Sequence, residues 1–148
     1  MAKTGKIQIK AFGIERYDEM RAVWENAGLS CKPKGRDSKK EISKQIEASP
    51  DLFIGAFDGE KMIGVCIATD DGRRGWINRL AVLPEYRGKG AAKKIVTACE
   101  KSLRKRGRKI FCAQIEGKNE KSLALFAAAG YKVHNDIIYV TKRESNEI

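Results

Sequence analysis

Apolar and polar residues alternate at the start of the chain, and apolar residues then recur every three or four positions. The alternation over residues 6–12 predicts a half-buried strand, because successive side chains of a strand point to opposite faces. The spacing over residues 20–27 predicts a helix with one apolar stripe, which Gly28 can end in a left-handed cap. A proline and a glycine then predict a basic loop over residues 29–38.

A second helix and two further strands are predicted next. The sequence Ser38-Lys-Lys-Glu41 has the spacing of a capping box, so a short helix is expected to begin there. Runs 52–57 and 61–69 are strand-like and flank an Asp-Gly-Glu turn, which predicts a hairpin. With a third long strand over 76–83 and the opening strand, they would form an antiparallel meander.

The second half of the chain begins with helical periodicity. Apolar residues between positions 88 and 106 fall on one side, and lysines and a glutamate on the other, which predicts an amphipathic helix. A strand over 109–115, a helix over 122–129, and two terminal strands over 131–133 and 136–142 would complete the chain.

Length and composition restrict the class of protein. The 148 residues fit one domain, residues 1–148. With 42% hydrophobic and 33% charged residues, the chain is typical neither of a disordered nor of a membrane protein. Because the N-terminus also lacks the apolar core of a signal peptide, we expect a soluble protein of the cytoplasm.

Cysteine and histidine give no signal for a metal site. The four cysteines are widely spaced and contain no C-x-x-C pair, which favours reduced core thiols over disulfides or zinc ligands. His134 is the only histidine and has no partner at the spacing of metal ligands. No metal is therefore expected.

A glycine-rich turn between a strand and a long helix is the most informative part of the chain. Residues 80–93 read Leu-Ala-Val-Leu-Pro-Glu-Tyr-Arg-Gly-Lys-Gly-Ala-Ala-Lys. The first amides of a helix have no intrahelical partner, and the helix dipole adds partial positive charge, so such a terminus binds phosphate. Gly88 and Gly90 lack the Cβ atoms that would block a pyrophosphate. Positive charge is added by Arg87, Lys89 and Lys93.

Two segments resemble the GNAT superfamily of N-acetyltransferases. Arg87-x-x-Gly90-x-Ala92, which follows Leu-Ala-Val and a proline, resembles the acetyl-CoA motif R/Q-x-x-G-x-G/A of that family. Residues 119–131 read Asn-x-x-Ser-x-x-Leu-Phe-x-x-Ala-Gly-Tyr and are similar to its C-terminal signature. Their order, separation and flanking elements also match, so the chain resembles a small, stand-alone prokaryotic member.

The resemblance implies an α+β fold. Its centre would be a twisted, mostly antiparallel sheet of about six to seven strands, with about four helices. The strand over 76–83 would bulge and splay from the next parallel strand, leaving a wedge for pantetheine. The implied activity is transfer of an acetyl group from acetyl-CoA to a primary amine, of a protein or a small molecule, by direct attack in a ternary complex.

The resemblance also implies which residues bind acetyl-CoA. The backbone of the strand would bond the pantetheine, and the turn and helix start would hold the pyrophosphate, with two positions contributed by the C-terminal signature. The expected residues are Leu80, Ala81, Val82, Arg87, Gly88, Lys89, Gly90, Ala91, Ala92, Lys93, Asn119 and Phe126.

The catalytic residues depart from the family's pattern. Phe126 stands where relatives often have a tyrosine that protonates the leaving thiolate, and phenylalanine cannot donate a proton. Gln114 stands where some relatives have a carboxylate. Glu116 would share a strand face with Gln114 by alternation and is the candidate general base, directly or through water. Tyr131 and Tyr139 are alternative sources of a hydroxyl group.

Two other classes of function stay open. Phe126 and Gln114 would also suit a CoA-binding regulator without turnover. The net charge of +11 would suit an RNA- or ribosome-associated protein, although the aromatic platform of single-strand binders is missing. Nucleic acid is not required by the leading hypothesis, and no membrane partner is expected. The sequence is compatible with a homodimer and does not define the acceptor or the acyl-chain preference.

Overall fold

The computed structural model describes residues 6–148, and its centre is one mixed sheet. The strands lie in the order β1 (Ile7–Ala11), β2 (Phe53–Asp58), β3 (Lys61–Asp70), β4 (Gly75–Val82) and β5 (Phe111–Ala113). Neighbouring strands are antiparallel from β1 to β4, whereas β5 pairs with β4 in parallel. The predicted α+β class and the antiparallel meander are confirmed.

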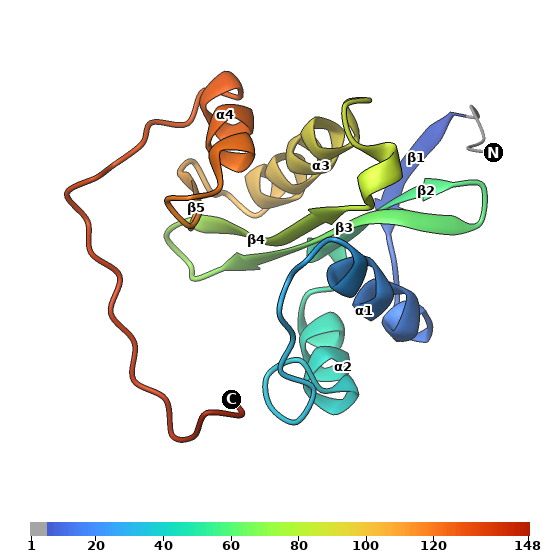
Figure 1. The fold of residues 1–148 in the computed structure, drawn as a ribbon. Coiled ribbons are helices and arrows are strands. Elements are labelled where there is room, and N and C mark those ends of the chain that lie inside the picture. Colours follow the sequence, from blue (N-terminus) through green and yellow to red (C-terminus); the bar gives the residue numbers. More distant parts are fainter. Residues whose placement is uncertain (1–5) are drawn as a thin grey trace.

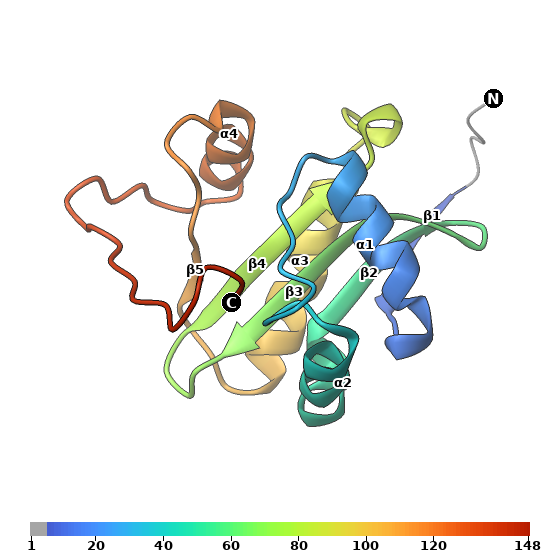
Figure 2. The same ribbon diagram turned by 60° about the horizontal axis from the view of Figure 1, so that its bottom comes forward.

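Four helices cover the two faces of the sheet (Figures 1 and 2). They are α1 (Tyr17–Asn26), α2 (Lys39–Ala48), α3 (Ala91–Lys105) and α4 (Glu120–Ala128), with short 3-10 turns at Ile14–Arg16, Pro50–Leu52 and Pro84–Tyr86. Helices α1 and α2 lie on one face, and α3 lies on the other. In Figure 2, the loop between α1 and α2 crosses in front of β3 and β4.

Local chemistry explains where the first two helices begin and end. Gly28 has φ +85° after the end of α1, a conformation that glycine adopts without steric cost. The Ser38 side chain accepts a hydrogen bond from the Glu41 amide at 3.1 Å and caps α2. Both signals were predicted from the sequence and are confirmed.

The core lies between the sheet and the helices on each face. Every residue of β2 is buried, because β2 lies between β1 and β3 and α3 packs on it, while α1 packs on β3 and β4. Trp24 from α1 and Ile95 from α3 are completely buried. Cys66 and Cys99 are also buried, in agreement with the prediction of core thiols.

The predicted strands over 131–133 and 136–142 are wrong. Residues 131–148 contain neither helix nor strand and form an extended tail (Figure 1). The tail leaves the sheet after α4, and its end returns to the loop that follows α1, where Lys32 Nζ donates to the Asn146 carbonyl at 2.8 Å. Ile138 and Val140 are more than four-fifths exposed in this tail. A strand forms only where a neighbouring strand offers backbone groups for hydrogen bonds, and alternation along the sequence does not show whether such a neighbour exists. The sheet therefore has five strands rather than six to seven, and β5 is shorter than the predicted 109–115.

None of the helices within residues 6–148 combines the length and the apolar character that crossing a membrane requires.

Candidate functional site

A β-bulge interrupts β4 near its middle. Between the pairs Val65↔Ala81 and Ile67↔Asn78, one residue of β3 lies opposite two residues of β4, Arg79 and Leu80. Arg79 has φ +58° and is the only non-glycine residue with positive φ between residues 6 and 148. This conformation costs about 1–2 kcal/mol for a residue with a Cβ atom, so the surrounding structure must hold it in place.

The pairing of β4 with β5 ends just before the bulge. The parallel ladder runs from Gly75↔Phe111 to Ile77↔Ala113 and goes no further. From Asn78 onward, no strand within residues 6–148 pairs with β4 on the β5 side. Such groups can bond an extended ligand as they would bond another strand. The bulge and the divergence of the two strands were both implied by the resemblance, and both are confirmed.

Beyond the bulge, β4 leads through Pro84–Tyr86 into the glycine turn and α3. Gly88 has φ +78° and Gly90 has φ +82°, and a Cβ atom at either position would meet no other atom within 4 Å. Gly90 is the N-cap of α3 and supplies no side chain to cap it, and the first turn of α3 contains no acidic residue. The first amides of the helix therefore stay available to an anion.

A cavity of about 220 Å³ opens at this turn. It brings together many of the residues expected to bind the cofactor, namely Val82, Arg87, Gly88, Gly90, Ala91, Ala92 and Lys93. Leu80 and Ala81 precede them on β4, and Lys89 lies with Nζ 5.7 Å from the centre of the Tyr86 ring. Tyr86 and Leu125 complete the lining, so α4 also reaches the cavity.

The turn is anchored by contacts that the sequence did not reveal. The Tyr86 hydroxyl donates a hydrogen bond to Asp58 Oδ2 at 2.6 Å, and this bond raises the pKa of Tyr86. Arg87 donates from Nε to the Val82 carbonyl at 3.1 Å and from Nη2 to the Ala27 carbonyl at 3.5 Å. Arg87 thus stabilises the turn as well as adding positive charge to it.

The C-terminal signature forms α4 and the residues that follow it. Asn119 Oδ1 accepts a hydrogen bond from the Ser122 amide at 3.1 Å and caps the helix. Phe126 is buried and packs edge-to-face on Tyr131, with the ring centres 5.0 Å apart. Asn119 and Phe126 therefore lie outside the lining of the 220 Å³ cavity, and their side chains act first on the helix itself.

The candidate acid and base residues lie in different surroundings. The Tyr131 hydroxyl donates to Glu100 Oε2 at 2.6 Å, and burial together with this bond raises the pKa of Tyr131. Tyr139 is exposed on the tail. Gln114 and Glu116 are exposed beyond the end of β5, so strand alternation does not define which way they face. The Glu116 carboxylate makes no hydrogen bond or ion pair within residues 6–148.

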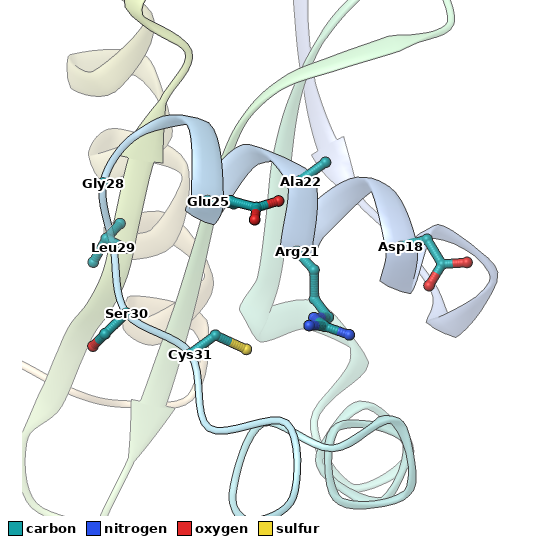
Figure 3. A pocket seen from close by; sticks show the side chains of 8 residues that line it. All are labelled: Asp18, Arg21, Ala22, Glu25, Gly28, Leu29, Ser30 and Cys31. Carbon is teal, nitrogen blue, oxygen red and sulfur yellow. The ribbon is translucent and has the colours of Figure 1, made fainter.

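On the opposite face of the sheet from α3, a second cavity of about 580 Å³ lies between α1 and the loop that follows it (Figure 3). Asp18, Arg21, Ala22 and Glu25 line it from α1, and residues 28–31 line it from the loop. Figure 3 shows the Arg21 side chain pointing toward Cys31 across this cavity. No motif in the sequence predicted it.

Arg79 connects the bulge to this loop. Its Nη2 donates to the Ser30 carbonyl at 2.5 Å, and its guanidinium lies over the Trp24 ring at 4.2 Å from the ring centre. Arg79 was not among the site residues predicted from the sequence. The available signal was an arginine between the apolar residues Ile77 and Ala81 of a predicted strand, where alternation places all three on one face. The end of the β4–β5 ladder and the open start of α3 are the geometry expected of a protein that binds an extended, phosphorylated ligand.

Comparison with known proteins agrees with this class. The sequence model of the acetyltransferase (GNAT) family matches residues 17–131. Acetyltransferase SG1711 of Sodalis glossinidius is 27% identical over 137 residues, which cover 93% of this chain and 95% of that protein.

Solved structures show the same fold. PaiA N-acetyltransferase of Thermoplasma acidophilum, in complex with coenzyme A, superposes with a TM-score of 0.77 at 21% identity, over 90% of this chain and 94% of that one. The aminoglycoside N-acetyltransferase AAC(6')-Iy, in complex with a bisubstrate analogue, also has a TM-score of 0.77, at 17% identity over 94% and 99% of the two chains.

Because the family match spans most of its length, the chain belongs to the acetyltransferase (GNAT) family. It is an N-acetyltransferase, and acetyl-CoA is the acyl donor that this family uses. The expectations about enzyme class and cofactor are confirmed.

Proposed function

We propose that this chain transfers the acetyl group of acetyl-CoA directly to a primary amine within a ternary complex. The observation that carries the proposal is the end of the β4–β5 ladder at Ile77↔Ala113, on the strand that leads to the open start of α3. Pantetheine would bond the backbone of Leu80, Ala81 and Val82, and the pyrophosphate would lie on the amides of residues 88–93. That the similar PaiA N-acetyltransferase binds coenzyme A supports a coenzyme A site in this fold.

Direct transfer needs no covalent enzyme intermediate. The amine nitrogen attacks the thioester carbonyl carbon, the C–S bond breaks, and coenzyme A leaves as a thiolate while the amine loses a proton. A backbone N–H of the bulged strand would stabilise the developing oxyanion. Burial raises the pKa of Cys112, so this thiol stays protonated and is a poor nucleophile. The complex of AAC(6')-Iy with a bisubstrate analogue, which joins coenzyme A to an acetylated amine, supports simultaneous binding of donor and acceptor.

Glu116 is the proposed general base. Its carboxylate is exposed and unengaged within the described residues, so it can accept the proton of the amine directly or through a water molecule. No residue is assigned as the acid, because Phe126 has no proton to donate and the Tyr131 hydroxyl is bound to Glu100. The coenzyme A thiolate is a good leaving group, and positioning supplies much of the rate.

The acceptor would enter from the face of the sheet that carries α1. Residues 28–31 form one wall of the 580 Å³ cavity on this face (Figure 3). The Ser30 carbonyl of that wall accepts a hydrogen bond from Arg79 at the bulge. Donor and acceptor would thus approach the bulge from opposite sides. Such an arrangement allows both substrates to be bound at once.

Calorimetric titration of acetyl-CoA into matched glycine variants tests the donor site. Gly90→Glu places a carboxylate against the pyrophosphate, whereas Gly90→Gln imposes the same backbone strain without the charge. We expect micromolar binding by the wild type, a small loss in the glutamine variant and loss of at least about a hundredfold in the glutamate variant, because like charges in a partly enclosed site repel strongly.

The control pair is Gly107→Gln and Gly107→Glu at the other end of α3, where φ is +90° and the surroundings are also open. Equal affinities within this pair would show that the effect at Gly90 is local. Equal affinities of Gly90→Gln and Gly90→Glu would contradict a pyrophosphate at the turn.

A turnover assay separates the enzyme from a CoA-binding regulator. Release of the coenzyme A thiol is followed with spermidine, neamine and a tetrapeptide with a free N-terminal amine, and the acetylated product is identified by mass. Turnover of at least one amine is expected. Tight binding of acetyl-CoA without turnover of any of these amines would favour the regulator.

A further inference from the structure

The bulge residue Arg79 combines a strained backbone with a side chain that crosses between two elements. Its φ of +58° is unique among the non-glycine residues from 6 to 148. Backbone strain of this kind persists where the surroundings determine the conformation, and it is concentrated at functional sites. The Arg79 side chain contacts Trp24 of α1 and Ser30 of the loop that follows α1.

The guanidinium group of Arg79 lies between α1 and the loop that follows it. It stacks over the fully buried Trp24 with Cζ 4.2 Å from the ring centre, and Nη2 donates to the Ser30 carbonyl at 2.5 Å. The same nitrogen is 3.8 Å from Asp37 Oδ2, whose side chain is only 5% exposed. A guanidinium group that lies over an aromatic ring while one of its nitrogens donates a hydrogen bond is a geometry that lysine cannot reproduce.

Asp37 extends this contact through the loop. Its Oδ2 accepts a hydrogen bond from the Lys32 amide at 2.7 Å, and its carbonyl accepts one from the Tyr17 hydroxyl at 2.5 Å. The loop is therefore closed on itself around Asp37 and tied to α1, and Arg79 is its link to β4. Residues 28–31 at the start of this loop form one wall of the 580 Å³ cavity (Figure 3).

We propose that Arg79 is a positioning residue for the acceptor: it fixes the loop over residues 30–37 to the β4 bulge and so sets the distance between amine and thioester. The inference rests on the proposed function, because it assumes that the donor lies along β4 and the acceptor beside the loop. Arg79 would then influence the position of both substrates. Its backbone shapes the strand beside the donor, and its guanidinium group holds the loop beside the acceptor.

The test compares variants of Arg79 by binding and by steady-state kinetics with spermidine, neamine and the tetrapeptide amine. In Arg79→Met, we expect the Kd for acetyl-CoA to stay within about threefold, and kcat/KM for the amine to fall at least about thirtyfold, because a misplaced acceptor loses the near-attack geometry. For Arg79→Lys, we expect a kcat/KM for the amine between the values of the wild type and Arg79→Met, since lysine keeps the charge beside Asp37 and loses the stack on Trp24.

Two further variants separate positioning from stability. Arg79→Gly removes the side chain and the backbone strain together, so it should be at least as heat-stable as Arg79→Met and equally impaired with the amine. Arg106→Met is the matched control, because Arg106 is also part-buried and ion-paired, to Asp51 at 2.6 Å, but belongs to the far end of α3. It should lower the melting temperature and leave the KM for the amine unchanged. If Arg79→Met does not fold, Arg79→Lys carries the comparison.

The outcomes distinguish this inference from the proposed function. If the wild type is active, two results would overturn the positioning role alone. In one, the Arg79 variants keep the kcat/KM for the amine; in the other, they lose affinity for the amine and for acetyl-CoA in equal measure. A wild type that binds acetyl-CoA and acetylates none of the amines would overturn the proposed function and this inference with it.

Discussion

Replacing Tyr131 by phenylalanine removes a hydroxyl group that either stabilises the fold or serves the chemistry. The hydroxyl donates to Glu100 Oε2 at 2.6 Å, and Glu100 is mostly buried, with a side chain 15% exposed. After the substitution, Arg104 at 3.9 Å is the remaining charged partner of Glu100. A hydrogen bond to a carboxylate contributes about 1.5–3 kcal/mol, and the partial exposure of Tyr131 places this bond near the lower end.

The ring contact survives the change, because phenylalanine keeps the edge-to-face packing on Phe126 at 5.0 Å. We therefore expect Tyr131→Phe to lower the free energy of unfolding by about 1.5 kcal/mol. For a chain of this length, that corresponds to a fall of about 3–6 °C in Tm. Urea unfolding and thermal melts followed by circular dichroism measure both quantities.

The same variant should leave catalysis intact, with kcat changed by less than about threefold, because a hydroxyl engaged with Glu100 and given a raised pKa is not the acid. Loss of a general acid would instead lower kcat by about 100- to 10,000-fold. Glu100→Gln keeps an oxygen acceptor and should destabilise less, and the double variant should show coupling of about 1 kcal/mol. A hundredfold loss of kcat with an unchanged melting temperature would refute the reasoning.

Three further predictions concern the base, a helix cap and a turn. Glu116→Gln should lower kcat/KM for the amine about a hundredfold, whereas Glu120→Gln should not; equal values in the two variants would exclude Glu116 as the base. Ser38→Ala should lower the free energy of unfolding by about 1 kcal/mol in urea, through loss of the α2 cap, and an unchanged midpoint would contradict the capping role. Hydrogen bonds lower the pKa of Asp71 to about 2, and the largest contribution comes from the Arg74 amide. The ionised Asp71 carboxylate therefore stabilises the folded state fully above about pH 4, and this stabilisation is lost as the pH falls toward 2. Stability of Asp71→Asn should therefore decline less than that of the wild type over this interval, and parallel acid titrations would count against it.

The elements that the sequence predicted well are those set by neighbouring residues. The α2 cap depends on two side chains three positions apart, and the end of α1 depends on one glycine with positive φ. The hairpin of β2 and β3 follows from two apolar runs and a short turn. In each case, the atoms that decide the structure lie within a few positions of one another, so their pattern is visible along the chain.

The prediction of the terminal strands was wrong because strands depend on residues far apart in the sequence. Residues 136–142 have strand-like composition, but a strand needs a ladder partner that lies far away in the sequence. The extent of the β4–β5 pairing likewise depends on distant residues, since it ends at Ile77, just before the bulge at Arg79 and Leu80. Propensity predicts which segments can be extended, and it does not predict where two extended segments separate.

The same distinction divides the candidate site into two halves. The proposed donor half consists of backbone amides at a helix start, and the glycines at positions 88 and 90 make this turn visible in the sequence. The acceptor half depends on which side chain of β4 meets the loop after α1, and this contact joins Arg79 to Ser30 across 49 residues. A family of enzymes can therefore keep one recognisable donor motif while each member builds its own acceptor wall. For that reason, substitutions of Arg79 test acceptor binding more directly than a comparison of glycine turns between relatives does.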